Sequence, residues 1–153
     1  VKQFTQESGN MINPKPSLMN KEETFFLIKM MLDEIMELGA TVASPEETKH
    51  TMTKFIRDSK DIPKETGSEI ELIASQADAL VDCYYYSLNA AAKKGVNISS
   101  VFNIVHKANM DKRDPKTGKF IKRTDGKIIK PDNWKAPDIV SEIKRQIDNG
   151  AFF

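Results

Sequence analysis

The stretch Phe25–Leu38, "FFLIKMMLDEIMEL", decides the fold, because its apolar residues recur at helical spacing while three carboxylates stand among them. On a helix of 3.6 residues per turn, six apolar side chains form one broad face: Phe25, Ile28, Met31, Leu32, Ile35 and Leu38. The three acids lie on the opposite side of the helix, together with Phe26 and Met30. A helix that is apolar nearly all round is usually buried on more than one side.

A second long helix, expected over residues 69–94, has the same character. Its main apolar face contains Ile73, Ala77, Leu80, Val81, Tyr84 and Leu88. Asp78 and Asp82 are one helical turn apart, so their side chains project together. Like charges at this spacing repel one another, and the repulsion grows when the pair is partly buried without a cation.

These two helices leave two interpretations of the acids open. If the helices face one another, Asp33, Glu34 and Glu37 would join the two aspartates as four or five oxygen ligands. Oxygen ligands of this kind suit Mg²⁺ or Mn²⁺ and not zinc. On geometry alone, a solvated acidic face, which is common on helices, explains the pattern as well.

Composition sets the broad class of the protein. A chain of 153 residues with a net charge of +1 is expected to form one domain over residues 1–153. The single cysteine, Cys83, excludes an intrachain disulfide and favours a reducing, cytoplasmic location. No apolar run approaches the roughly 20 residues that span a bilayer, so no membrane association is expected.

Cap residues and periodicity predict an all-α protein. We expect a helical body over about residues 1–110, a basic loop or hairpin over 111–137 and a final helix over 138–150. The body is expected to be an up-and-down bundle of four main helices. The predicted helices cover about 1–8, 20–42, 44–58, 69–94, 97–110 and 138–150.

The segment 112–135 is strongly basic, with 9 Lys/Arg against 3 Asp/Glu. Residues 120–123 and 127–130 flank the dipeptide Asp125-Gly126, which favours a hairpin turn. A segment of this charge suits either phosphate groups or a nucleic acid. The acidic body and the presence of only Phe120 and Trp134 as aromatic residues in this stretch argue against nucleic acid as a partner.

The motifs "DEIME" and "DALVDCYYY" together resemble the all-α nucleoside triphosphate pyrophosphohydrolases. That superfamily includes MazG-type enzymes, dimeric dUTPases and phosphoribosyl-ATP pyrophosphohydrolase, and it carries E-x-x-E and E-x-x-D pairs that bind Mg²⁺. Glu34 and Glu37 match the first pair, with Asp33 in the place of a third acid. The second pair departs from the pattern, because the acid that accompanies Asp82 is Asp78, four residues before it.

The C-terminal motifs "VFNIVHKANMDK", "DGKIIKP" and "WKAPD" resemble a MazG-like group often labelled Cof-like phosphohydrolase. Asn109 and Lys112 match one motif of that group, and Lys127 and Lys130 match the next two. Phe4 matches an aromatic residue of the group's opening helix. The Asp-x-Asp nucleophile of haloacid-dehalogenase chemistry is missing from the sequence, so that chemistry is not expected.

The resemblance implies a MazG-like four-helix bundle and a Mg²⁺-dependent enzyme of nucleotide-pool control, with Mn²⁺ as a second possible ion. It implies cleavage of a (deoxy)nucleoside triphosphate to the monophosphate and pyrophosphate, by a homodimer or higher homo-oligomer. An alternative substrate is another pyrophosphate-linked nucleotide such as phosphoribosyl-ATP, and the sequence does not choose the base or sugar. The expected catalytic and metal-binding residues are Glu34, Glu37, Asp78 and Asp82, with Asp33 as a further metal ligand; the expected substrate-binding residues are Asn109, Lys112, Lys127, Lys130, Phe4 and Tyr85.

Overall fold

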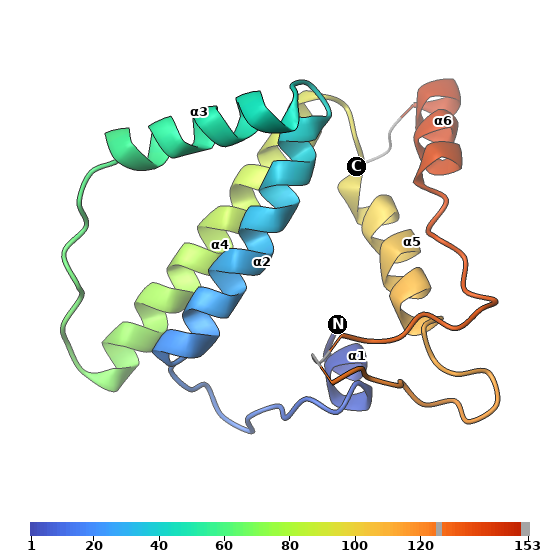
Figure 1. The fold of residues 1–153 in the computed structure, drawn as a ribbon, viewed down its shortest axis with the longest axis horizontal. Helices are drawn as coiled ribbons and strands as arrows, with labels where there is room; N and C mark the ends of the chain where they lie inside the picture. Colours follow the sequence, from blue (N-terminus) through green and yellow to red (C-terminus); the bar gives the residue numbers. More distant parts are fainter. Residues whose placement is uncertain (125–126, 151–153) are drawn as a thin grey trace. The chain divides into compact units, whose positions relative to one another are not determined.

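The computed structural model describes residues 1–124 and 127–150, and the regular structure in these residues is helical (Figure 1). The helices are α1 (Lys2–Glu7), α2 (Lys21–Ala40), α3 (Pro45–Asp58), α4 (Glu69–Lys93), α5 (Ile98–Met110) and α6 (Ile139–Asn149). The expected all-α fold class is therefore confirmed. Within the described residues, no helix is both long and apolar enough to cross a membrane.

The helices begin at the residues whose side chains can cap them. The Asn20 side chain accepts a hydrogen bond from the Glu23 backbone N–H, and the Glu23 carboxylate accepts one from the Asn20 N–H, which completes a capping box. Ser44 caps α3 by accepting from the Glu47 N–H, and proline stands at the first helical position. Asp138 caps α6 in the same way. Local side-chain chemistry thus sets where these helices start.

The chain divides into two compact units, which we call the helical unit (Pro16–Ala79) and the terminal unit (Val1–Lys15 with Leu80–Phe153). In the helical unit, α2 and α3 approach closely at Gly39, where an added Cβ would meet the Thr48 side chain. Thr48 is buried, and its hydroxyl donates to the Ser44 carbonyl at 2.9 Å. The α2–α3 corner therefore depends on a residue without a side chain at position 39.

In the terminal unit, a polar network joins α5 to α6. Gln146 is buried; its Oε1 accepts from the Asn97 N–H, and its Nε2 donates to the Ser100 hydroxyl, both at 2.9 Å. Glu142 accepts from the Ser100 hydroxyl at 2.6 Å and forms an ion pair with Arg145. Ala108 is the one buried apolar residue among those described. Hydrogen bonds of buried and half-buried polar side chains therefore help to hold this joint.

The expected hairpin is present only as a short pairing. The Ile129 N–H donates to the Ile121 carbonyl at 2.8 Å, and Lys122 and Ile128 form an isolated antiparallel bridge. The pairing ends at Pro131, which has no N–H to donate. The predicted turn at Asp125–Gly126 lies outside the described residues.

The α2–α3 corner generates a stability prediction. Gly39→Ala places a methyl group against the Thr48 Cγ2 atom and should destabilise the protein by about 1–3 kcal/mol, because overpacking outweighs the better helix propensity of alanine. Thr48→Ser removes that Cγ2 atom, so the double variant should recover most of the loss. Denaturant unfolding of the two single variants and the double variant measures this coupling. Additive effects of the two substitutions would contradict the close contact.

The α5–α6 joint generates a pH prediction. Hydrogen bonds from Arg145, Ser100 and Gln146 hold the pKa of Glu142 well below its usual range. A lowered folded-state pKa gives stability that is complete above the unfolded pKa of about 4.3 and is lost as the pH falls through the folded value. Glu142→Gln should therefore melt at a lower temperature than wild type at pH 7, and the difference should shrink below about pH 4. A difference that stays constant from pH 7 to pH 3 would show that the charge of Glu142 does not stabilise the joint.

Candidate functional site

The acids of α2 are exposed on one side of the helix. Glu34 and Glu37 are three residues apart, so their carboxylates project from the same face, and both are exposed. Asp33 differs, because its carboxylate lies 3.9 Å from the ammonium group of Lys29 on the same helix. This exposed ion pair contributes little to stability, but among the described residues it gives Asp33 a basic partner that Glu34 and Glu37 lack.

The acids of α4 form the second predicted pair. Asp78 and Asp82 are one turn apart on this helix, and both are exposed. Tyr85, one turn beyond Asp82, is 67% exposed, so it packs into no core of the described chain. Neither aspartate has a lysine or arginine within ion-pair distance among the described residues.

Within the helical unit, the α2 acids and Asp78 do not meet. The Gln76 side chain of α4 forms two hydrogen bonds with the Met19 backbone. Its Nε2 donates to the Met19 carbonyl at 3.0 Å, and its Oε1 accepts from the Met19 N–H at 2.9 Å. Figure 1 shows α2 and this part of α4 running in the same direction. At 1.5 Å per residue, Glu34 is about 20 Å beyond this contact along α2, whereas Asp78 is only about 3 Å beyond it along α4.

This offset has a direct consequence for metal binding. In the described part of the chain, no three His, Cys, Asp or Glu side chains lie close enough together to hold a metal ion. The chemistry of the donors nevertheless fits Mg²⁺, because each helix offers a pair of exposed carboxylates. Mg²⁺ is commonly held by one or two carboxylates, with substrate phosphates and waters as its other ligands. Glu34 with Glu37, and Asp78 with Asp82, are thus the residues that fit the ion.

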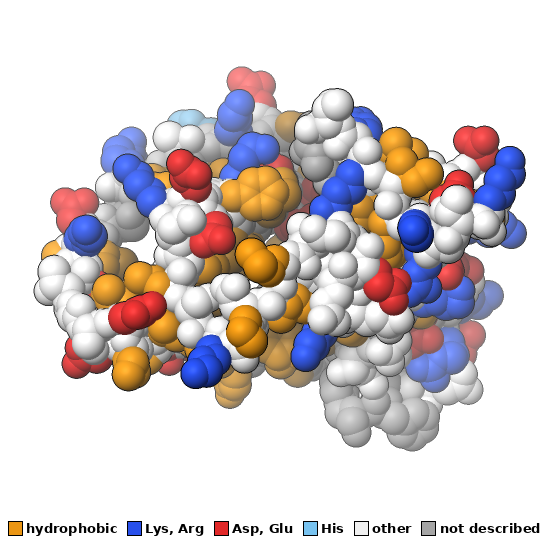
Figure 2. All heavy atoms as spheres, turned by 90° about the horizontal axis from the view of Figure 1, so that it is seen from below, with side chains coloured by type: hydrophobic (Ala, Val, Ile, Leu, Met, Phe, Trp, Pro, Cys, Tyr) orange, Lys and Arg blue, Asp and Glu red, His pale blue; other side chains and the backbone are white. Residues whose placement is uncertain are grey.

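Apolar side chains surround these acids at the surface. Phe26 is 66% exposed, and Leu38 is 70% exposed. No residue of α2 or α4 is buried. Figure 2 shows hydrophobic side chains reaching the surface between charged ones.

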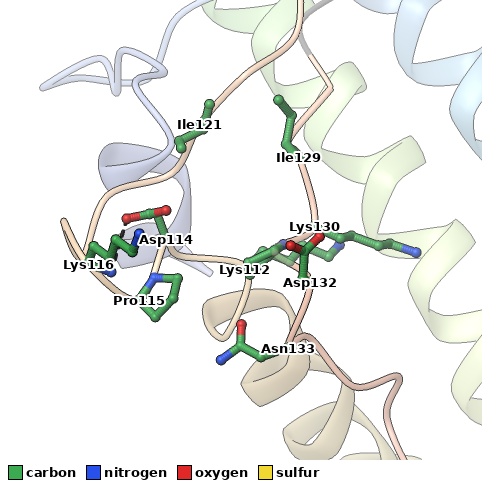
Figure 3. Close-up of a pocket in the computed structure, with 10 residues that line it drawn as sticks. Lys112, Asp114, Pro115, Lys116, Ile121, Ile129, Lys130, Asp132 and Asn133 are labelled. Atoms are coloured by element: carbon green, nitrogen blue, oxygen red, sulfur yellow. Dashed lines mark hydrogen bonds between the residues drawn. The ribbon is translucent and has the colours of Figure 1, made fainter.

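The basic segment of the terminal unit forms a pocket of about 530 Å³ (Figure 3). Lys112, Lys116 and Lys130 line it, with Asp132 and Asn133 close to Lys112 and Lys130 in the view. Its other lining residues are Asp114, Pro115, Ile121, Ile129 and Pro131. The pocket thus contains two of the lysines predicted to bind phosphate.

Lys112 occupies the most constrained position of this group. It is half-buried, and its ammonium group donates to the Asn109 side-chain oxygen at 2.6 Å. Burial and the nearby charge of Lys130 lower the pKa of Lys112 below its ordinary value. Asn109, predicted to contact a base or sugar, therefore uses its oxygen on Lys112.

The remaining predicted substrate residues lie elsewhere. Phe4 packs edge-on against Phe120 at 5.2 Å between ring centroids, so α1 rests on the basic segment. Arg113 strengthens this contact through an ion pair with Glu7. Lys127 is exposed and does not line the pocket described above.

Sequence reasoning did not place Lys116 or Trp134 in this site. The available signal was the turn sequence from Asp114 to Gly118. The Asp114 carboxylate accepts from the Lys116 and Thr117 N–H groups, and this folds the loop so that Lys116 lines the pocket. Trp134 lies beside this pocket, and its indole N–H donates to the Ala108 carbonyl, 26 residues earlier, a contact for which the sequence carries no local signal.

Comparisons with known proteins address the family and the fold. The sequence profile of the phosphoribosyl-ATP pyrophosphohydrolase family matches residues 1–109, a span that contains all the predicted acidic ligands. No curated protein matches the chain. The fold resembles a crystal structure from Exiguobacterium sp. 255-15, a protein provisionally identified as an NTP pyrophosphohydrolase. That match has a TM-score of 0.77 and 24% identity, and it covers 98% of this chain and 95% of the other.

Proposed function

This chain belongs to the phosphoribosyl-ATP pyrophosphohydrolase family and is a pyrophosphohydrolase. We propose that it cleaves a nucleoside triphosphate to the monophosphate and pyrophosphate, with Mg²⁺ as cofactor. The proposal extends to nucleotide-pool control in the cytoplasm, which the nucleotide substrate and the lone Cys83 favour.

One observation carries the proposal. Glu34, Glu37, Asp78 and Asp82 are exposed carboxylates within the family match, and none of them is neutralised by a lysine or arginine among the described residues. Surface acids with no catalytic task are often paired along a helix, as Asp33 is with Lys29. Exposed carboxylates in pairs at one-turn spacing suit Mg²⁺, which one or two carboxylates commonly hold together with substrate phosphates.

The chemistry follows from these groups. Mg²⁺, when bound, neutralises phosphate charge and orients the triphosphate. A carboxylate left outside the coordination accepts a proton from the water that attacks the α-phosphorus, and pyrophosphate leaves. Glu34 and Glu37 are the first candidates for ion binding, with Asp78 and Asp82 completing the site. Tyr85, exposed one turn beyond Asp82, is a candidate for contact with the base.

Phosphoribosyl-ATP is a second candidate substrate. Phosphoribosyl-ATP is favoured by the family whose profile matches residues 1–109. The nucleoside triphosphate is favoured by the identification given to the Exiguobacterium protein, whose fold extends over the C-terminal segment as well. Both substrates present the same triphosphate to the acids, so the proposed roles of the residues do not change.

We also propose that the chain works as a homodimer or a higher homo-oligomer, with each site built from two chains. The exposed apolar residues of α2 and α4 support a partner surface. The offset between Glu34 and Asp78 within one chain supports a site in which α2 of one copy meets α4 of another. Isologous pairing of two copies generates two such sites.

The reaction itself is the first prediction of this section. Incubation with each NTP and dNTP, or with phosphoribosyl-ATP, in the presence of Mg²⁺ should release pyrophosphate and a monophosphate. Chromatography of the nucleotide products and a pyrophosphate assay identify them. Orthophosphate as the first product, or no turnover of any of these nucleotides, would contradict the proposal.

A matched pair of glutamate variants tests the site. Glu37→Gln should lower kcat by at least about a hundredfold, because the amide is a poor ligand and a poor base. Glu22→Gln, which changes an exposed glutamate in the first turn of the same helix, should leave kcat unchanged. Circular dichroism verifies that both variants fold. Full activity of Glu37→Gln would rule out the proposed metal site.

Subunit mixing tests whether the site lies between chains. Glu37→Gln and Asp78→Asn should each be inactive alone, but a mixture allowed to exchange subunits should recover up to about a quarter of wild-type activity. Half of the mixed dimers would contain both chains, and one of their two sites would carry both native acids. No recovery after verified exchange would place each site within a single chain.

A further inference from the structure

Helix α1 is attached to the basic segment by aromatic and charged side chains. The Phe4 and Phe120 rings meet edge-on, and the Arg113 guanidinium group lies 5.6 Å from the centroid of the same Phe120 ring. The Arg113 Nε–H donates to the Glu7 carboxylate at 2.8 Å. With six residues, α1 is far shorter than the roughly 12–15 residues that an isolated helix needs to be stable. Helix α1 and the basic segment therefore stabilise one another.

Glu7 is the centre of this attachment. Gln3, one turn earlier on α1, donates from its Nε2 to one carboxylate oxygen of Glu7 at 2.8 Å, and Arg113 donates to the other. The side chains of Glu7 and Arg113 are 37% and 32% exposed, so water and salt screen this ion pair less than one at the open surface. Glu7 is also the one acidic residue of α1. The charged link to Arg113 therefore depends on this residue.

The stretch 120–122 has α1 on one side and the pocket on the other. The Lys122 ammonium group donates to the Asn10 side-chain oxygen at 3.3 Å, two residues beyond the Phe120 contact. Ile121, between them, lines the pocket beside Ile129 (Figure 3). Successive side chains of an extended chain point to opposite faces. The contacts with α1 thus determine that Ile121 faces the pocket.

Arg113 has the same intermediate position at the end of α5. It lies between Lys112 and Asp114, both of which line the pocket, but it does not line the pocket itself. Its backbone N–H donates to the Met110 carbonyl at 3.3 Å, so the chain continues directly from the last turn of α5. A side chain held by Glu7 at this point therefore also holds the backbone from which Lys112 projects.

We propose that Glu7 is a positioning residue for the reaction, which acts through Arg113 to hold residues 112–122 in the conformation that forms the pocket. This assignment rests on the proposed function and on the prediction that Lys112 and Lys130 contact the substrate. A segment that is already ordered loses less conformational entropy when a ligand binds. If only a fraction of the molecules is ordered, the apparent affinity falls by that fraction. The carboxylates of α2 and α4 set kcat, which stays unchanged.

The kinetics of Glu7 variants separates positioning from simple electrostatics. The substrate is a polyanion, so the loss of a negative charge from the protein would by itself lower KM. Positioning predicts the opposite sign. Glu7→Gln should raise KM by about two- to fivefold with kcat unchanged, and Glu7→Arg, which places two positive charges together, should raise it further. A KM that is unchanged or lower in both variants, or a loss confined to kcat, would overturn the assignment.

Charge reversal tests the pairing itself. Arg113→Glu should also raise KM, and the double variant with Glu7→Arg should have a lower KM than either single variant, because opposite charges face one another again. Gln6→Arg is the matched control, since it adds a positive charge at an exposed position about 100° around the same helix. It should keep KM within about twofold of wild type. A double variant as impaired as Arg113→Glu, or equal impairment by Gln6→Arg, would overturn the assignment.

Amide hydrogen exchange tests the same link without turnover. The Ile129 N–H donates to the Ile121 carbonyl at 2.8 Å, so its exchange reports whether the pocket wall stays folded. Mass spectrometry of peptides from residues 111–130 should show faster exchange in Glu7→Arg and a return towards the wild-type rate in the double variant. Peptides from α3 serve as the internal control and should not change. If Glu7→Arg does not fold, Glu7→Gln supplies both measurements.

The two measurements together distinguish failure of the positioning role from failure of the proposed function. Unchanged exchange with unchanged KM, or faster exchange with unchanged KM, would overturn the positioning role and leave the function standing. Faster exchange in Glu7→Arg, reversed in the double variant of a chain that hydrolyses no nucleotide, would refute the proposed function and leave the link between α1 and the pocket wall standing.

Discussion

The exposed apolar surface of α2 and α4 is the constraint on which the rest of the structure depends. Neither helix has a buried residue, and together they carry half of the exposed large apolar side chains of the described residues. Burial of apolar surface contributes about 25 cal/mol per Å² and dominates the stability of folded domains. The acids predicted to bind the metal ion stand on the same two helices. Whatever surface covers these helices therefore also determines which carboxylates meet.

The sequence predicted local structure well, because helix starts depend on contacts within four residues. Asn20, Ser44 and Asp138 cap helices where the sequence placed them. The alignment of α2 against α4 could not be predicted from contacts within four residues. It depends on the hydrogen bonds between Gln76 and Met19, which are 57 residues apart in the chain. A glutamine among apolar residues carries no signal for a contact at that range.

The basic segment shows the same limit on sequence reasoning. The resemblance predicted Lys112 and Lys130 as substrate-binding residues, and the structure brings their ammonium groups near the same indole ring. The sequence offered no reason to distinguish these two lysines from Lys127, which does not line the pocket that contains them. Phe4 was expected near a base, but its ring packs on Phe120 and ties α1 to the basic segment. Aromatic contacts between distant residues decide these positions, and neither periodicity nor charge reports them.

The two acidic pairs of α2 and α4, and two of the lysines predicted to bind the substrate, share one feature, which is that they form no ion pairs among the described residues. Residues 101–153 carry 12 Lys/Arg and 7 Asp/Glu, whereas the rest of the chain is acidic. Among the described residues, Glu34, Glu37, Asp78 and Asp82 have no basic partner, and Lys112 and Lys130 have no acidic one. Exposed charged groups without an ion-pair partner can bind a ligand of opposite charge without first breaking an ion pair.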